Sequence, residues 1–140
     1  MEIIKYILTF VFGFFTILIG DYIWLWYVVK FFTIREFWDL IVVENGNIKV
    51  NLTAGLLAWV SIVLLLLIFV VRYAKTPTEA LLYGALFGGL LYAMYDLTNL
   101  TFLKNYSFTF TIIDICWGVF LCSIVSLSMF YGRILVAKFF

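Results

Sequence analysis

Residues 50–71 read VNLTAGLLAWVSIVLLLLIFVV and contain no charged side chain over 22 positions. A helix of this length rises about 33 Å, which matches the roughly 30 Å hydrocarbon core of a lipid bilayer. The stretch is therefore predicted to cross a membrane as one helix, and lipid is the solvent for most of the chain.

Three further apolar runs of spanning length flank it, at residues 6–29, 80–103 and 108–132. Pro77 lies in the turn before the third run and is expected to begin a helix, with Thr76 or Thr78 as its N-cap. The predicted fold is all-α, an integral membrane four-helix bundle. Residues 1–140 are expected to form a single transmembrane domain.

The segment 31–43, between the first two spans, is too polar to cross the membrane. Its apolar positions 34, 37, 38, 41 and 42 recur at helical spacing among charged residues. We expect a short amphipathic helix lying in the membrane interface. Aromatic residues near the span ends are expected to form a belt at the head groups, namely Tyr6, Trp26, Tyr27, Tyr73, Tyr106 and Tyr131.

The composition excludes several classes of function. Apolar residues make up 66% of the chain and charged residues 12%, against roughly 45–50% and 25% in soluble domains. Nine basic and eight acidic residues give a net charge of +1, so no basic surface for nucleic acid is expected. With no His and two Cys, imidazole chemistry and Cys-rich zinc motifs are excluded, and no cofactor is expected.

The two cysteines, Cys116 and Cys122, occur in one apolar run. A helix would place them on different faces, about 9 Å apart along its axis, so a disulfide between them is not expected. We interpret both as small buried packing residues.

An even number of spans places both termini on one side of the membrane. Lys and Arg number five on that side (Lys5, Arg72, Lys75, Arg133 and Lys138) and four on the other (Lys30, Arg35, Lys49 and Lys104). Because basic residues are enriched in cytoplasmic loops, we expect cytoplasmic termini and a multi-pass protein of the cell inner (plasma) membrane.

Each of the other three spans carries one aspartate. At 1.5 Å per residue, Asp21, Asp96 and Asp114 lie about 12, 10 and 9 Å below the same surface. A charged residue within a span costs roughly 2.5–3.5 kcal/mol on insertion scales, so such residues usually face the bundle interior. The three carboxylates are therefore predicted to share one polar layer inside the bundle.

A large polar or aromatic residue follows each acid after three positions, on the same helical face: Trp24, Asn99 and Trp117. These six residues are the predicted ligand- or ion-binding set. The span at 50–71 adds further polar groups near that level, Asn51, Thr53 and Trp59.

Stripes of small residues run along the same helices. They comprise Ala85, Gly89 and Ala93; Gly84 and Gly88; and, after Asp114, the residues Gly118, Cys122 and Ser126. Small residues let helix backbones approach closely. The acid-bearing faces are therefore predicted to be packing faces as well.

Three motifs resemble those of the bacterial domain-of-unknown-function family 2177: residues 21–24 (DYIW), 92–99 (YAMYDLTN) and 114–118 (DICWG). The stretch 95–99 (YDLTN) is the most specific, and the resemblance covers most of the chain. It implies a small inner-membrane protein with four spans and no assigned reaction. The residues around these motifs are unusually rich in Phe, Ile and Tyr.

Something must neutralise three carboxylates in the membrane. One or two of them could hold a proton, Lys30, Lys49 or Lys104 could reach inward, or a cation could be bound. Like charges crowded in a low dielectric cannot all remain ionised, so we expect the layer to take up a proton or a cation.

Three functions fit these residues. The layer could bind or transport a proton, a metal ion or a small cationic solute, with Trp24, Trp59 and Trp117 offering cation–π faces. Four helices are few for alternating access, so such a transporter is expected to be a homo-oligomer with Gly84 to Gly88 as its contact. Alternatively the aspartates could act on a lipid head group as acid–base groups or cation ligands, or the layer could serve only to hold the helices together.

Overall fold

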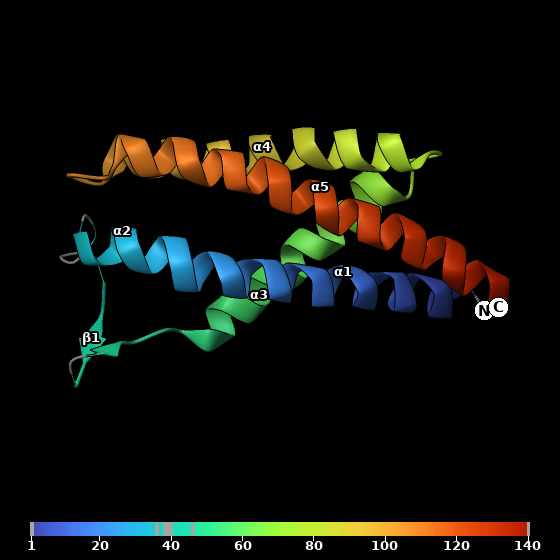
Figure 1. The fold of residues 1–140 in the computed structure, drawn as a ribbon, viewed down its shortest axis with the longest axis horizontal. Coiled ribbons are helices and arrows are strands. Elements are labelled where there is room, and N and C mark those ends of the chain that lie inside the picture. Colours follow the sequence, from blue (N-terminus) through green and yellow to red (C-terminus); the bar gives the residue numbers. More distant parts are fainter. Residues whose placement is uncertain (1, 36, 38–40, 46, 140) are drawn as a thin grey trace.

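The computed structural model describes residues 2–35, 37, 41–45 and 47–139. Within these residues, four helical segments are long and apolar enough to cross a membrane: Glu2–Phe32, Leu52–Val71, Pro77–Phe102 and Phe108–Phe139. Both chain ends lie at the same end of the bundle (Figure 1). The predicted fold class, an all-α membrane helical bundle, is confirmed.

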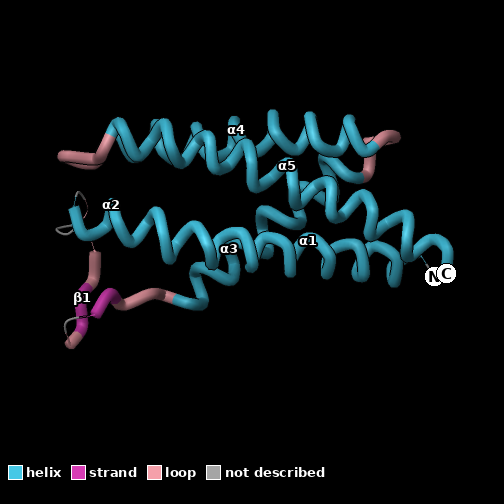
Figure 2. The backbone as a smooth tube through the Cα atoms, in the orientation of Figure 1, coloured by secondary structure: helices cyan, strands magenta, loops and turns pink. Residues whose placement is uncertain are grey.

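The first span consists of α1, a π-helical segment and α2, which follow one another without a break. A short antiparallel pair of strands, β1 and β2, comes before the second span (Figure 2). In chain order the elements are α1 (Glu2–Trp24), η1 (Leu25–Val29), α2 (Lys30–Arg35), β1 (Val43–Glu44), β2 (Asn47–Ile48), α3 (Leu52–Leu66), η3 (Leu67–Val71), α4 (Pro77–Phe102) and α5 (Phe108–Phe139).

Two spans extend beyond the apolar runs that predict them. The first helix begins at Glu2 rather than residue 6, and α5 ends at Phe139 rather than residue 132. Hydropathy marks only the part of a helix that lies in hydrocarbon. The backbone continues to pair its N–H and C=O groups beyond that point, so the helix is longer than its apolar window.

The amphipathic helix expected over 31–43 is wrong in its extent. Helix α2 ends at Arg35 and prolongs the first span in line (Figure 1), and Ile41 and Val42 are not helical. Positions 36 and 38–40 lie outside the described residues. Phe32 and Phe37 are buried against Phe110 of α5. The centre of the Phe110 ring lies 5.4 Å from that of Phe32 and 5.0 Å from that of Phe37, so this part of the segment packs against α5.

Side chains satisfy backbone groups at the ends of the helices. Thr76 accepts a hydrogen bond from the Glu79 N–H at 3.1 Å, and Pro77 is the first residue of α4, as the sequence predicts. Arg133 donates to the carbonyl oxygens of Val71 at 2.5 Å and Ala74 at 2.8 Å. The carbonyls at the end of the second span are thus paired inside the protein.

Helix α5 contacts α1, α3 and α4 and is the centre of the bundle. Gly84 and Gly88 of α4 pack against α5: a Cβ at Gly84 would come within 2.6 Å of the Ser126 Oγ, and one at Gly88 within 2.5 Å of the Cys122 Cβ. The prediction that these glycines form a contact between copies is therefore wrong. Their lack of a side chain is needed for the close approach of α4 and α5.

The two larger clusters of core residues lie in different halves of the bundle. An apolar cluster fills the half nearer the termini, and an aromatic cluster made of Trp24, Phe32, Phe37 and Phe110 lies in the other half. Cys122 belongs to the apolar cluster, whereas Cys116 is exposed, and both thiols are free. The prediction that both cysteines are buried is therefore wrong for Cys116, which faces outward.

Candidate functional site

The three aspartates of the spans all point into the bundle. The exposed fraction is 8% for Asp21 on α1, 0% for Asp96 on α4 and 7% for Asp114 on α5. None of them faces the surface that lipid would cover. A charged side chain in contact with lipid tails is energetically costly, so burial inside the bundle is expected for all three.

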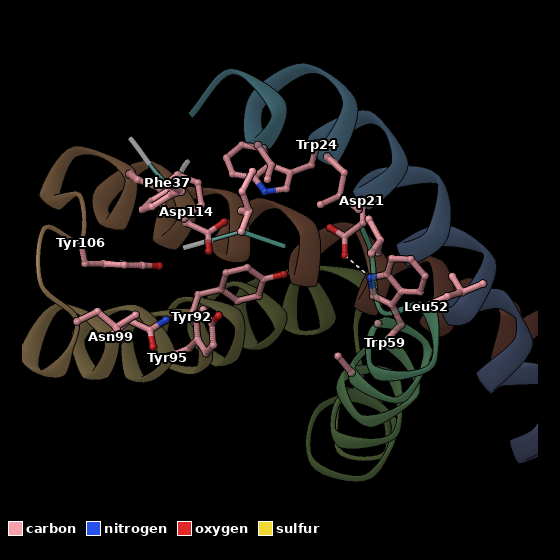
Figure 3. Close-up of a pocket in the computed structure, with 18 residues that line it drawn as sticks. Asp21, Trp24, Phe37, Leu52, Trp59, Tyr92, Tyr95, Asn99, Tyr106 and Asp114 are labelled. Atoms are coloured by element: carbon pink, nitrogen blue, oxygen red, sulfur yellow. Dashed lines mark hydrogen bonds between the residues drawn. The ribbon is translucent and has the colours of Figure 1, made fainter. Parts of the chain in front are cut away.

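Two indoles hold the carboxylate of Asp21. Trp59 of α3 donates from Nε1 to Oδ2 at 2.5 Å, and Trp117 of α5 donates from Nε1 to Oδ1 at 3.1 Å. Figure 3 shows the first of these bonds at one side of the pocket. Each carboxylate oxygen of Asp21 therefore has a neutral donor, and these bonds tie α1 to both α3 and α5.

The two Asp-x-x-Trp motifs pair across helices rather than along them. Trp117 follows Asp114 on α5 but donates to Asp21 on α1, and it stacks on Trp24, which follows Asp21 and lies near Asp114. The rings of Trp24 and Trp117 stack between the two acids, with centroids 4.7 Å apart and planes 5° from parallel. This crossed arrangement fixes the relative position of α1 and α5 at the level of the acids.

Tyr106, in the short loop between α4 and α5, supplies a donor to Asp96. Its hydroxyl donates to Asp96 Oδ1 at 2.8 Å. Burial raises the pKa of the Tyr106 phenol, and the bond to Asp96 raises this pKa further, so the phenol remains a donor. The predicted position of Tyr106 in the head-group belt does not account for this contact.

The carboxyl groups of Asp96 and Asp114 lie close together. Asp96 Oδ2 is buried and has no hydrogen-bond partner when the carboxylates are ionised, because an ionised carboxylate only accepts. The two carboxyls are close enough to form a hydrogen bond once one of them carries a proton. A single shared proton would satisfy Oδ2 and remove one of two adjacent charges.

Tyr92 lies among all three acids. Its phenol is close enough to Asp21, Asp96 and Asp114 for electrostatic interaction with each. In Figure 3 the Tyr92 ring extends from α4 across the pocket towards the side where Asp21 and Trp59 lie. Sequence reasoning missed this residue, although its position four residues before Asp96 places it on the same helical face.

Two neighbouring cavities open onto these groups. The first, of about 580 Å³, lies towards the loops and is lined by Asn99, Trp24 and Tyr106 among others. The second, of about 410 Å³, lies between α3 and α4. Asp96 and Trp117 line neither cavity and lie behind the lining residues. Six residues line both: Asp21, Ala58, Trp59, Tyr92, Tyr95 and Asp114.

Basic side chains take no part in the described contacts of these acids. Lys49 pairs with Glu44 at 2.9 Å, Lys30 lies 4.7 Å from the centre of the Trp26 ring, and Lys104 is exposed. The inward-reaching lysine considered from the sequence is thus absent from the described residues. Those residues also hold no group of three or more His, Cys, Asp or Glu suited to a metal ion.

Four apolar helical spans around a buried polar site define a multi-pass integral membrane protein. The sequence model of the family described as "Predicted membrane protein (DUF2177)" matches residues 6–131, and the chain belongs to this family. The resemblance seen in the motifs is thereby confirmed. No curated protein and no solved structure matches the chain.

Proposed function

We propose that the buried carboxyl cluster is a binding site at which a proton exchanges with a small cationic solute. One observation carries this proposal: the described hydrogen bonds to these buried acids, two to Asp21 and one to Asp96, come only from neutral donors, and no described ion pair includes any of the three. Indole and phenol dipoles stabilise a carboxylate but do not cancel its charge. A proton or a cation from outside the chain supplies that charge.

The surroundings of the cluster favour a cation with an organic surface. Trp24, Trp59 and Tyr92 line the 580 Å³ cavity beside Asp21 and Asp114, and aromatic faces attract cations. Cavities of roughly 300–1,000 Å³ are typical of small-molecule sites. Exchange of this ligand with a proton would serve either sensing or transport.

The experiment uses the full chain in lipid nanodiscs and tetramethylammonium as the cationic probe. We expect a pH-indicator dye to report release of protons on addition of the probe, and Asp114→Asn to abolish that release. Glu44→Gln is the matched control, because Glu44 is an exposed acid in a loop ion pair. No proton release from the native chain, with no cation binding, would contradict the proposal.

Flux measurements separate the candidate activities. Uptake of the probe into liposomes in response to a proton gradient would identify transport, whereas turnover of a lipid by the purified protein would favour the enzyme alternative. If Asp114→Asn changes only the melting temperature, the polar layer is purely structural. A transporter built on four helices would require a second copy of the chain, so its oligomeric state should be measured alongside.

We place the protein in the cell inner (plasma) membrane with both termini in the cytoplasm. The end of the bundle that holds the termini carries five of the nine Lys and Arg residues, and the enrichment of basic residues on the cytoplasmic side supports this orientation. The candidate site then lies nearer the opposite face of the membrane.

A further inference from the structure

We propose that the ligand of this site is a lipophilic organic cation that enters sideways from the bilayer, through the opening between α3 and α4. This inference rests on the proposed function and specifies its substrate class and its route. It is carried by the position of the second cavity, by the chemistry of its walls and by an unsatisfied buried oxygen behind it.

The second cavity lies at hydrocarbon depth. Its lining includes Ala58 and Leu65 on α3 and Leu91 and Tyr95 on α4. At 1.5 Å per residue these positions are about 9–20 Å from the loop ends of their helices, a range that includes the middle of a roughly 30 Å core. An opening at this depth meets acyl chains rather than head groups or water.

The arrangement of the helices leaves this side of the bundle open. Helix α3 packs mainly on α1, whereas α4 packs on α5. Figure 1 shows α3 running obliquely across the bundle, from the side of α1 at the loop end towards the start of α4. The 410 Å³ cavity occupies the space between α3 and α4, and Met94 and Tyr95, which are 64% and 62% exposed, stand at its rim.

The walls of the cavity match an organic cation better than an inorganic one. Ile62, Leu65 and Leu91 supply aliphatic surface, and the carboxyls of Asp21 and Asp114 lie at the end that is shared with the first cavity. A hard metal ion needs six or more oxygen ligands to replace its water, and the described residues hold no cluster suited to a metal. A lipophilic cation needs only charge complementarity and apolar contact.

The buried oxygen of Asp96 is an independent indication that the cluster has an exchangeable occupant. Asp96 is fully buried, its Oδ2 has no hydrogen-bond partner, and its carboxyl group lies close to that of Asp114. A proton between these two groups satisfies Oδ2 while the cavity is empty. When the cation pairs with Asp114, that proton is released, so proton and cation compete for one carboxylate.

The test is equilibrium and kinetic binding of radiolabelled tetraphenylphosphonium to the full chain in lipid nanodiscs, measured by scintillation proximity. We expect tetraphenylphosphonium to bind more tightly than tetramethylammonium, and more tightly as pH rises. Asp114→Asn should weaken its binding about 30-fold or more, because a buried charge loses its partner.

Substitutions at the rim test the route. Met94→Trp should lower the association and dissociation rates together by about tenfold, since it narrows the opening, and Met94→Ala should raise both. Leu90→Trp is the matched control: Leu90 lies on the same helix, is also 64% exposed and is absent from the cavity lining. It should leave both rates unchanged.

The outcomes distinguish this inference from the proposed function. Tighter binding of tetramethylammonium than of tetraphenylphosphonium would overturn the substrate class and leave the proposed function standing. Equal kinetics for the Met94 and Leu90 variants would overturn the lateral route. Absence of binding by either cation, together with absence of proton release, would overturn both proposals.

Discussion

Neutral side chains supply the hydrogen bonds that the structure describes to the buried aspartates Asp21 and Asp96. Trp59 and Trp117 donate to Asp21, and Tyr106 donates to Asp96. A hydrogen bond to a charged group contributes roughly 1.5–3 kcal/mol, which offsets only part of the cost of removing an ion from water. The side chains thus position the carboxyls, and in the proposed function an exchangeable proton or cation balances their charge.

Tyr106→Phe should destabilise the protein by about 1–3 kcal/mol, because it removes the donor to a buried carboxylate oxygen and keeps the ring packing. The measurement is unfolding in detergent micelles. Tyr131→Phe is the control, since Tyr131 is exposed and its change should stay within about 0.5 kcal/mol. Equal effects of the two substitutions would show that the Tyr106–Asp96 bond does not stabilise the fold.

Alkaline pH should reduce the difference in free energy of unfolding between the native chain and the Tyr106→Phe variant. Burial raises the folded-state pKa of Tyr106 above the unfolded value of about 10. The neutral phenol is favoured in the folded state, so its contribution is complete below about pH 10 and is lost as pH rises towards the folded pKa. Unfolding titrations of both chains from pH 8 upward would test this, and a constant difference would contradict it.

At the scale of helices, close packing of α4 on α5 is what holds Asp96 beside Asp114. Gly88→Ala should cost about 1–3 kcal/mol, because the new Cβ would overlap Cys122. Gly55→Ala on α3 is the matched control: its Cβ would meet nothing within 4 Å, so it should be neutral or stabilising by up to about 1 kcal/mol. Unfolding in micelles gives both values, and a neutral Gly88→Ala would contradict the packing.

The helices themselves are predictable from the sequence, because each span is a long apolar run and a helix pairs its backbone N–H and C=O groups internally, as the hydrocarbon core requires. Residues 31–43 are not, since their apolar spacing fits an interfacial helix as well as the observed end of α2 at Arg35 and packing of Phe37 on Phe110. The depth of the three acids follows from the helical rise alone. Their partners do not, because Trp117 of α5 donates to Asp21 of α1 and stacks on Trp24, and that depends on how the helices rotate against each other.

Over the whole molecule, the polar site lies in the half of the bundle away from the termini, and the tight apolar core lies in the other half. The opening between α3 and α4 adjoins this polar site. Sequence patterns indicate that a polar layer exists, but the cavities and the role of Tyr92 depend on packing between helices that are distant in the chain.

The topology can be tested by cysteine labelling. Glu2→Cys and Phe139→Cys, in a background with Cys116→Ser, should react with a membrane-impermeant reagent from the same side, and Glu44→Cys should react from the other. Membrane vesicles of both orientations provide the comparison. Labelling of positions 2 and 139 from opposite sides would contradict the four-span bundle.

The central claim, that the acid cluster holds an exchangeable proton, is tested most directly by infrared spectroscopy of the native chain in lipid near neutral pH. The structure of the Asp96–Asp114 pair predicts a protonated-carboxyl band that shifts in deuterium oxide, disappears in Asp96→Asn and fades when the cationic probe is added. Two results would contradict this claim. One is a spectrum in which every carboxyl is ionised near neutral pH without a bound cation, and the other is a band that neither Asp96→Asn nor the probe changes.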